Sequence, residues 1–281
     1  MAQLIQIRQR IKAIETIKKI THAMRLIAMS SHTRLKGLQK PLKNYQQALA
    51  SLFNTVKLAH PQWYNPLFKP AQDTGKTLII LIGSQKGLCG NFNSSLFYSF
   101  DDELPQLLKK NPVFIAVGKK AIDHLIQKKG ITPLIQYKNM NAGTIAGMAR
   151  AIINLISNTQ PYYESVIVFS NHLKTFFIQK PETMVLIPFT MSETMPLASP
   201  EEYQWEQPAE EILNDLAQQL LVAHLEYLLF ESLLAEQAAR FISMDSSTRN
   251  ANNLLDETKL TYNKLRQANI TKELSELTGS F

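Results

Sequence analysis

Residues 208–279 read PAEEILNDLAQQLLVAHLEYLLFESLLAEQAARFISMDSSTRNANNLLDETKLTYNKLRQANITKELSELTG, and neither proline nor glycine occurs between the two ends of this stretch. Apolar and small side chains recur in it with heptad spacing, which is typical of a coiled coil. The two registers are Leu213, Leu220, Tyr227, Leu234, Phe241, Thr248, Leu255, Tyr262 and Asn269, and Leu216, Ala223, Phe230, Gln237, Met244, Ala251, Thr258 and Leu265. A helix of about 70 residues is ~105 Å long, too long for one globular domain of this chain. The pattern predicts a single C-terminal helix over residues 208–281, much of which projects.

The apolar seam of this helix weakens along its length. Its side chains are bulky up to Leu234, mixed as far as Leu255, and polar at Asn269 and Lys272. Such a gradient indicates a helix that pairs within the chain at first and whose far end is held by another protein.

A second long helix is predicted at the N-terminus, where no proline or glycine occurs from Ala2 to Lys36. Residues in steps of three and four mark one face of it, namely Ile7, Ile11, Ile14, Ile17, Thr21, Met24, Ala28 and Ser31. Gly37 and Pro41 weaken the helix, and residues 45–58 continue it after a kink. We expect residues 1–58 to pair antiparallel with residues 208–281 as one shaft.

Residues 77–190 alternate between short apolar runs and helical segments. Extended runs are expected at 77–82, 112–117, 131–137, 164–170, 175–179 and 183–189, with helices at 93–110, 119–129 and 144–157. Strands that alternate with helices favour a parallel sheet covered by helices. The predicted fold class is therefore α/β, a long antiparallel coiled coil joined to a Rossmann-like parallel-sheet domain.

Charge is concentrated at the N-terminus of this 281-residue chain. The net charge is +7, and residues 1–43 alone carry ten Lys or Arg against Glu15, a local charge of +9 that leaves −2 for the rest. The predicted basic helix face comprises Arg8, Arg10, Lys18, Lys19 and Arg25. Such a stripe indicates an acidic partner, which could be nucleic acid, anionic lipid or an acidic protein surface, unless it is only a solvated face.

Features of a catalytic or cofactor site are weak in this sequence. The segment GKT at 75–77 has Pro70 where a phosphate-binding loop needs glycine, and the loop GSQKGLCG at 83–90 lacks the dinucleotide spacing G-x-G-x-x-G. The six histidines are scattered without metal-ligand spacing. We therefore expect no catalytic residue, cofactor or metal, and interpret Gly87, Cys89 and Gly90 as a structural turn. The single cysteine excludes an internal disulfide and indicates a reducing compartment.

Five blocks of sequence resemble the gamma subunits of F-type ATP synthases. They are Ile7-Arg8 with 19–24 (KITHAM), 87–93 (GLCGNFN), 236–240 (EQAAR), 247–251 (STRNA), and 262–267 (YNKLRQ) with 270–274 (ITKEL). They occur in the family's order over the whole chain. Two departures are Gln85, where the family has an acid before the basic residue of the turn, and the absence of a small-residue tail after Phe281.

The resemblance implies a non-catalytic rotor shaft inside a ring of three alpha and three beta subunits, seated on the epsilon subunit and the c-subunit ring. Membrane association would come through the complex, at the cytoplasmic side of the bacterial plasma (inner) membrane, and no nucleic acid would bind. Matching positions place the alpha/beta-ring contacts at Met24, Arg240, Arg266, Gln267, Thr271 and Glu273.

Two other classes of protein fit parts of the pattern. A basic coiled-coil protein associated with nucleic acid would use the +9 segment on phosphates, but it lacks the aromatic residues that stack on single-stranded bases. A Rossmann-type enzyme with helical dimerisation arms would need the missing dinucleotide motif and an acid–base set.

Overall fold

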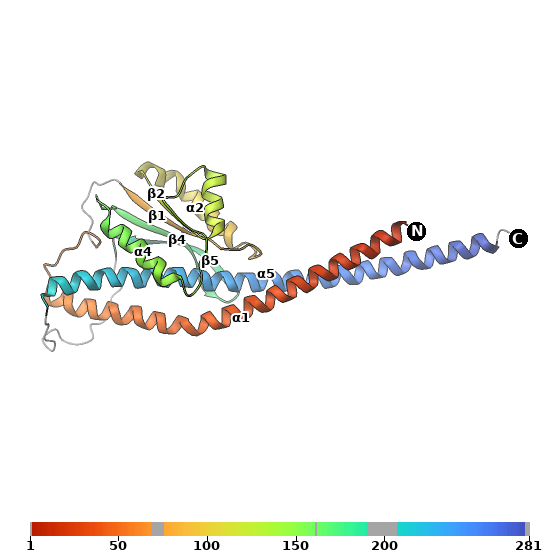
Figure 1. The fold of residues 1–281 in the computed structure, drawn as a ribbon, viewed down its shortest axis with the longest axis horizontal. Coiled ribbons are helices and arrows are strands. Elements are labelled where there is room, and N and C mark those ends of the chain that lie inside the picture. The colour runs from red at the N-terminus through yellow and green to blue at the C-terminus, as the bar shows by residue number, and fades with distance from the viewer. Residues whose placement is uncertain (1, 69–75, 161, 190–206, 279–281) are drawn as a thin grey trace. The chain divides into compact units, whose positions relative to one another are not determined.

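The computed structural model describes residues 2–68, 76–160, 162–189 and 207–278 (Figure 1). In chain order its elements are α1 (Ala2–Ala59), β1 (Thr77–Ile82), α2 (Phe92–Leu107), the 3-10 turn η1 (Leu108–Lys110), β2 (Val113–Val117), α3 (Lys119–Asp123), the π-helical turn η2 (His124–Lys128), β3 (Ile135–Tyr137), α4 (Ile145–Asn158), β4 (Ser165–Thr175), β5 (Ile178–Ile187) and α5 (Ala209–Thr278). The chain divides into two compact units. These are a paired-helix unit, residues 1–30 and 240–281, and a sheet unit, residues 31–239. Each long helix belongs partly to one unit and partly to the other. The ranges expected from the sequence, 1–58 and 208–281, assigned each helix as a whole to one shaft.

The C-terminal helix α5 is continuous from Ala209 to Thr278, as predicted. Its first turn follows Pro208, whose carbonyl oxygen accepts hydrogen bonds from the amides of Glu211 (3.0 Å) and Ile212 (3.3 Å). Glu210 and Glu211 place negative charge beside the exposed amides of this turn, where it is favourable. Gly279, a residue type that commonly ends a helix, lies outside the described residues.

The N-terminal helix α1 is also a single element, as expected for residues 1–58, and Gly37 and Pro41 lie inside it. Buried side chains on both sides of these residues, including Leu35, Leu49 and Phe53, belong to one hydrophobic core. Burial of this face outweighs the cost of one proline, so the helix continues beyond Pro41.

The sheet has the strand order β3-β2-β1-β4-β5. Strands β1 to β4 are parallel, with Ile80 of β1 opposite Ile115 of β2 and Val168 of β4. Strand β5 runs antiparallel to β4, so the expected parallel sheet has one antiparallel strand at its edge. Only Phe176 and Phe177 separate the two strands, and so short a connection permits a hairpin but no crossover to a parallel strand.

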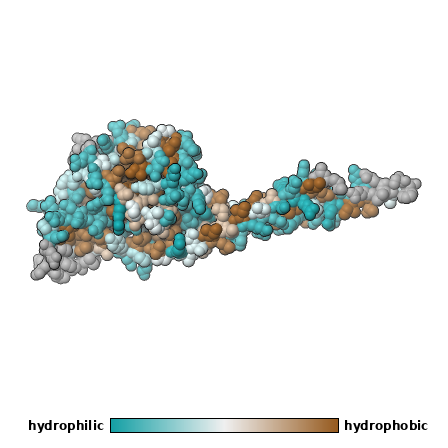
Figure 2. Space-filling view, in the orientation of Figure 1, coloured by the Kyte–Doolittle hydropathy of each residue, from teal (hydrophilic) through white to brown (hydrophobic). Residues whose placement is uncertain are grey.

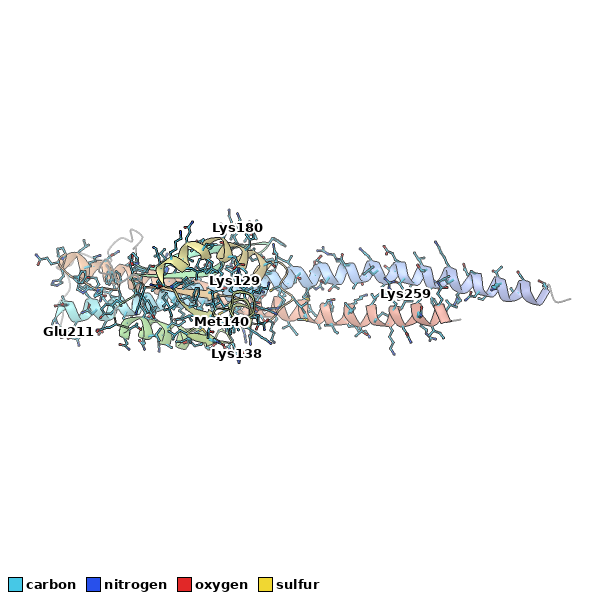
Figure 3. All side chains as sticks on the ribbon, turned by 90° about the horizontal axis from the view of Figure 1, so that it is seen from above. Lys129, Lys138, Met140, Lys180, Glu211 and Lys259 are labelled. Carbon is cyan, nitrogen blue, oxygen red and sulfur yellow. The ribbon has the colours of Figure 1, made fainter. Side chains whose placement is uncertain are left out.

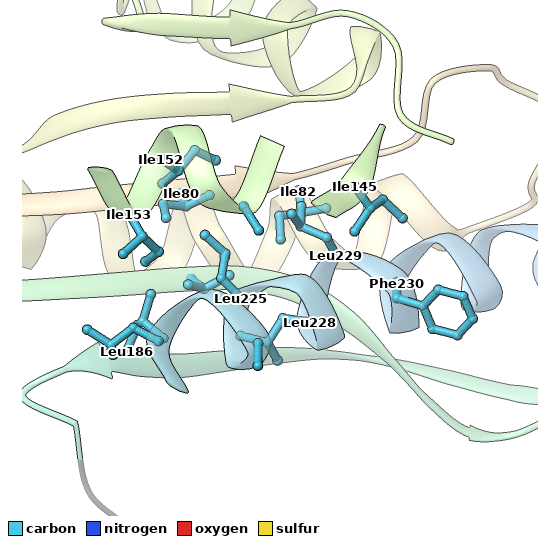
Figure 4. Close-up of a cluster of buried hydrophobic side chains, with 14 of the residues drawn as sticks. Ile80, Ile82, Ile145, Ile152, Ile153, Leu186, Leu225, Leu228, Leu229 and Phe230 are labelled. Atoms are coloured by element: carbon cyan, nitrogen blue, oxygen red, sulfur yellow. The ribbon is translucent and has the colours of Figure 1, made fainter. Parts of the chain in front are cut away.

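Two hydrophobic clusters cover the faces of this sheet. On one face, Leu78, Ile80 and Ile82 of β1 belong to a cluster with buried side chains of α1, α4 and α5, part of which Figure 4 shows. On the other face, Ile79 and Leu81 belong to a cluster with α2 and α3. The sheet unit is therefore a three-layer structure in which the inner halves of both long helices form part of one layer.

In the paired-helix unit, α1 and α5 run antiparallel, as predicted. As residue numbers rise along α1, the numbers of the partner residues on α5 fall. Glu15 pairs with Lys259 (3.3 Å), Thr21 with Thr248 (3.0 Å) and Arg25 with Asp245 (2.7 Å). A small cluster of Ile11, Ile14, Ala251 and Leu255 forms the apolar part of this contact. The pair therefore has a thin core and several polar cross-links.

The contact face of α1 differs from the predicted stripe at Ile17, which is 53% exposed. The half-buried residue there is Lys18. A seam between two helices alternates steps of three and four, and from Ile11 and Ile14 this alternation leads to Lys18, Thr21, Arg25 and Ala28. The predicted stripe instead takes another three-residue step after Ile14, which places Ile17 on the seam.

Two histidines of the sheet unit make its stability dependent on pH. Burial lowers the pKa of His224, which lies against Gln46, Met184 and the ring of Phe189. Burial, and then the nearby charge of Lys36, lower the pKa of His32. Because these folded-state pKa values lie below the unfolded value, the unfolded chain takes up protons first as the pH falls. The stabilisation is present above about pH 6.5 and is lost below it.

We therefore expect the urea midpoint of the full-length chain to decrease between pH 7.5 and pH 5.5. In His224→Gln the decrease should be smaller, because one of the two buried imidazoles no longer titrates. The measurement is equilibrium unfolding by circular dichroism at both pH values, and an equal decrease in the two proteins would contradict this assignment.

Candidate functional site

The distal part of α5 presents its side chains to solvent. Beyond Leu255, none of the described side chains of this helix is buried. Arg266, Gln267 and Thr271 are exposed there, and the Thr271 hydroxyl donates a hydrogen bond to the Gln267 carbonyl (3.0 Å). The side chain of Glu273 lies outside the described residues. Three of the predicted contact residues thus share one exposed segment that a partner could reach.

Met24 and Arg240, the other predicted contact residues, are less accessible. Met24 is half-buried on α1, and Arg240 is only 7% exposed. Little of the Arg240 guanidinium surface remains for a partner in this conformation. Its role as a contact residue stays a prediction.

The predicted basic face is divided between solvent and the helix seam. Arg8, Arg10 and Lys19 are exposed, whereas Lys18 and Arg25 are half-buried. Asp245 compensates the charge of Arg25 (2.7 Å) and also pairs with Arg249 one turn further along α5 (2.9 Å). Arg25 therefore joins the two helices, and the freely accessible positive charge lies nearer the N-terminus.

Exposed apolar side chains on the paired-helix unit were missed in the sequence analysis. They include Ile5, Ile17, Ile20, Leu26 and Ile27 of α1, and Leu254, Leu260, Ile270 and Leu274 of α5. Figure 2 shows apolar and hydrophilic residues interspersed along this part of the surface. A strict heptad count would have found these residues, since they are large apolar residues outside the seam. So many on one small unit indicate a surface that a protein partner covers.

The turn after β1 is held together by its own side chains. Asn93 accepts a hydrogen bond from the Ser84 amide (3.0 Å) and donates to the Ser84 hydroxyl (2.8 Å) and to the sulfur of Cys89 (3.1 Å). Cys89 is 3% exposed, Gly87 is half-buried, and Gly90 has a φ of 59° that favours glycine. These contacts suit the structural role expected of Gly87, Cys89 and Gly90.

A carboxylate of α5 closes the inner side of this turn. Glu236, which is 2% exposed, accepts a long hydrogen bond from the Gln85 amide (3.4 Å). In a dinucleotide-binding fold, the corresponding loop amides face a pyrophosphate. A buried carboxylate at that place would repel such a group, so the geometry suits the attachment of α5 to the sheet.

The described part of the chain contains neither a metal-binding cluster nor a helix that could span a membrane. No group of three or more His, Cys, Asp or Glu residues is arranged there to hold a metal ion. Among the same residues, no helix has the length and apolar character needed to cross a bilayer.

Comparison with known proteins agrees with the sequence blocks. The family model described as ATP synthase matches residues 3–281. The ATP synthase gamma chain of Polynucleobacter asymbioticus is 30% identical over 288 residues, which cover 99% of this chain and 98% of that one. This chain belongs to the ATP synthase gamma-chain family. The gamma chain of Mycoplasmopsis synoviae is likewise 30% identical, with 99% of this chain and 97% of that one covered.

Solved structures of ATP synthases share the fold of this gamma-family chain. A chain of the Euglena gracilis mitochondrial OSCP/F1/c-ring assembly matches with a TM-score of 0.65 at 15% identity, covering 99% of this chain and 93% of that one. A chain of the Tetrahymena thermophila central stalk/c-ring matches with a TM-score of 0.56 at 20% identity, covering 81% and 98%. None of these matches supports the alternative of a nucleic-acid-associated coiled coil.

Proposed function

We propose that this chain is the central-stalk rotor subunit of a bacterial F-type ATP synthase, and that it transmits ion-driven rotation to the alpha/beta ring for ATP synthesis or hydrolysis. The observation that carries the proposal is the paired-helix unit. Its two antiparallel helices share only a thin core, while large apolar side chains and basic groups face outward. A surface of this kind suits a shaft enclosed by other subunits.

The partners in this proposal are three alpha and three beta subunits around the paired helices, with the epsilon subunit and the c-subunit ring on the sheet unit. The chain itself would be non-catalytic. It would lie on the cytoplasmic side of the bacterial plasma (inner) membrane, attached through the complex. The chain's family and the assemblies named among its structural matches support this placement.

Coupling in such a motor requires that the shaft present different chemistry in different directions. A ligand or partner shifts a conformational equilibrium only through a difference in its interaction with the two states. On this chain the two helices expose different side chains, among them Lys19, Ile20 and Ile27 on α1 and Gln267, Ile270 and Thr271 on distal α5. Rotation of so unequal a surface would give each beta subunit a different contact in turn.

Within this proposal, Met24, Arg240, Arg266, Gln267, Thr271 and Glu273 contact the alpha/beta ring. The exposed charges of Arg8, Arg10 and Lys19 would orient the shaft against acidic parts of the ring, since exposed charges steer more than they hold.

The test uses the assembled complex in membrane vesicles. Arg266→Ala should reduce ATP-driven ion pumping relative to ATP hydrolysis, because a lost central contact costs about 1 kcal/mol, or roughly fivefold in a rate or population. Lys264→Ala, at an exposed position of the same helix segment, is the matched control and should leave the ratio unchanged. Equal pumping ratios in the two variants would argue against Arg266 as a contact, and failure of the wild-type chain to enter the complex would overturn the proposed function.

A further inference from the structure

A pocket of about 610 Å³ lies in the sheet unit where β1, β2 and β3 end. Its lining comes from the segments that follow these strands, including Lys86 after β1, Lys119 after β2 and Lys138 after β3. Lys138 is labelled in Figure 3. In open α/β sheets, ligands bind in crevices outside the carboxyl ends of the strands. The pocket has this location, and its volume falls within the range of small-molecule sites.

Positive charge dominates this pocket. Its charged lining residues are Lys86, Lys119, Lys138 and Asp123, a formal charge of +2. Among the described residues, neither Lys119 nor Lys138 forms an ion pair within 4.0 Å. A further lysine, Lys120, borders the same turn, since a Cβ atom on Gly87 would lie 4.0 Å from its Cε atom. Three lysines from three chain segments thus line one cavity together with a single carboxylate.

The backbone beneath the lysines is held rigidly. The Gly83 amide donates to the Val117 carbonyl (2.9 Å), the Gly118 amide to the Tyr137 carbonyl (2.8 Å) and the Lys120 amide to the Ser84 carbonyl (3.0 Å). These bonds link the three strand ends in series. The Gln85 side-chain amide also donates a hydrogen bond to the Asn139 side chain (2.8 Å), and both residues line the pocket. The backbone of this site therefore loses little conformational entropy when a ligand binds, whereas the exposed lysine side chains become ordered.

An apolar wall completes the pocket. Ile122 and Ile126, from α3 and the π-helical turn η2, line it on the side of these helices. The lining therefore combines cations for phosphate oxygens with an aliphatic surface for an uncharged organic group. Inorganic phosphate alone would leave much of the volume unfilled.

We propose that this pocket binds a small molecule with two or more linked phosphate groups, of the nucleoside diphosphate class. Lysine ammonium groups bind phosphate oxygens as point charges, and a diphosphate group would compensate the charge of +2. The proposed site lies on the β2–β3 side of Gln85, whereas Glu236 contacts the amide of that residue. This proposed binding site is additional to the rotor function and does not depend on that function.

The test uses the full-length chain without other subunits, so that no catalytic nucleotide site contributes. Lysine acylation is followed by mass spectrometry with pyrophosphate, ADP or adenosine, and affinities are measured by titration calorimetry. Pyrophosphate and ADP should protect Lys119 and Lys138, whereas adenosine should not. Lys109, exposed on η1, should react equally in all samples.

Two double variants distinguish binding at a specific site from a general effect of positive charge on the protein. Lys119→Gln with Lys138→Gln should weaken ADP binding by at least about tenfold, because two charge-assisted contacts are lost. The control, Lys109→Gln with Lys110→Gln, removes the same charge from exposed positions and should bind as the wild type does. Equal weakening in both double variants, or no protection by pyrophosphate and ADP, would overturn the proposal. Protection by a short polyglutamate peptide but not by pyrophosphate would overturn it in favour of an acidic protein segment.

Discussion

Replacing Gly118 with alanine is expected to lower the free energy of unfolding of the sheet unit by more than about 3 kcal/mol. Gly118 has a φ of 88°, which side chains rarely adopt, and a Cβ atom there would lie 2.2 Å from the carbonyl oxygen of Gly83. Because Gly83 is itself bonded to the end of β2, the backbone of the turn has little freedom to move away. The measurement is equilibrium unfolding of the full-length chain in urea.

Gly130→Ala is the matched control for this experiment. Gly130 also has a positive φ, 67°, but nothing lies within 4 Å of its ideal Cβ position. Its substitution should cost only the backbone strain, about 1–2 kcal/mol. The difference between the two variants measures the close approach of the β1 and β2 turns, and equal losses would show that this approach is absent.

Leu225→Ala should destabilise the chain by about 2–5 kcal/mol, through lost burial and the cavity it leaves. Leu225 is fully buried between α5 and the sheet (Figure 4). The same substitution at Leu254, which is 46% exposed on the same helix, should change the unfolding free energy by less than about 0.5 kcal/mol. Urea unfolding of both variants gives the comparison.

The two substitutions together test whether the inner part of α5 belongs to the core of the sheet unit and the distal part is exposed. A large loss in Leu254→Ala would mean that this residue is covered within the chain, contrary to the exposed surface that we assign to a partner. A small loss in Leu225→Ala would mean that the inner half of α5 is not part of the sheet unit's core.

Much of this fold follows from local patterns in the sequence. Heptad spacing and the absence of proline and glycine predicted α5, because these features act along the chain. Alternating apolar runs predicted the strands and the helices between them. Residues 45–58 were expected to continue the N-terminal helix, and α1 does continue through Pro41, because its buried face stabilises residues on both sides.

The errors in the prediction have identifiable physical causes. The antiparallel pairing of β5 with β4 was not predicted, because Phe176 and Phe177, which connect the two strands, carry no turn signal such as Asn-Gly or Asp-Gly. Ile17 was placed on the seam because a three-residue step and a four-residue step both fit a helix face over a short distance. The contact between Glu236 and the Gln85 amide joins residues 151 positions apart, and no local pattern encodes it.

The candidate site was predictable to a smaller extent. The exposure of Arg266, Gln267 and Thr271 agrees with a contact surface, yet their place in a complex came from sequence blocks shared with a family. The basic pocket was not predicted, because Lys86, Lys119 and Lys138 come together only when three parallel strands end at one edge.

The most direct test of the central claim is single-molecule rotation. The chain is labelled through Lys109→Cys, an exposed position, while its own Cys89 is buried and should remain unlabelled. It is then assembled with matching alpha and beta subunits that are fixed to a surface, and a bead is attached. The account predicts unidirectional rotation of the bead when ATP is added and none without it. A chain that assembles and leaves ATP hydrolysis intact, yet never turns relative to the ring, would contradict the account.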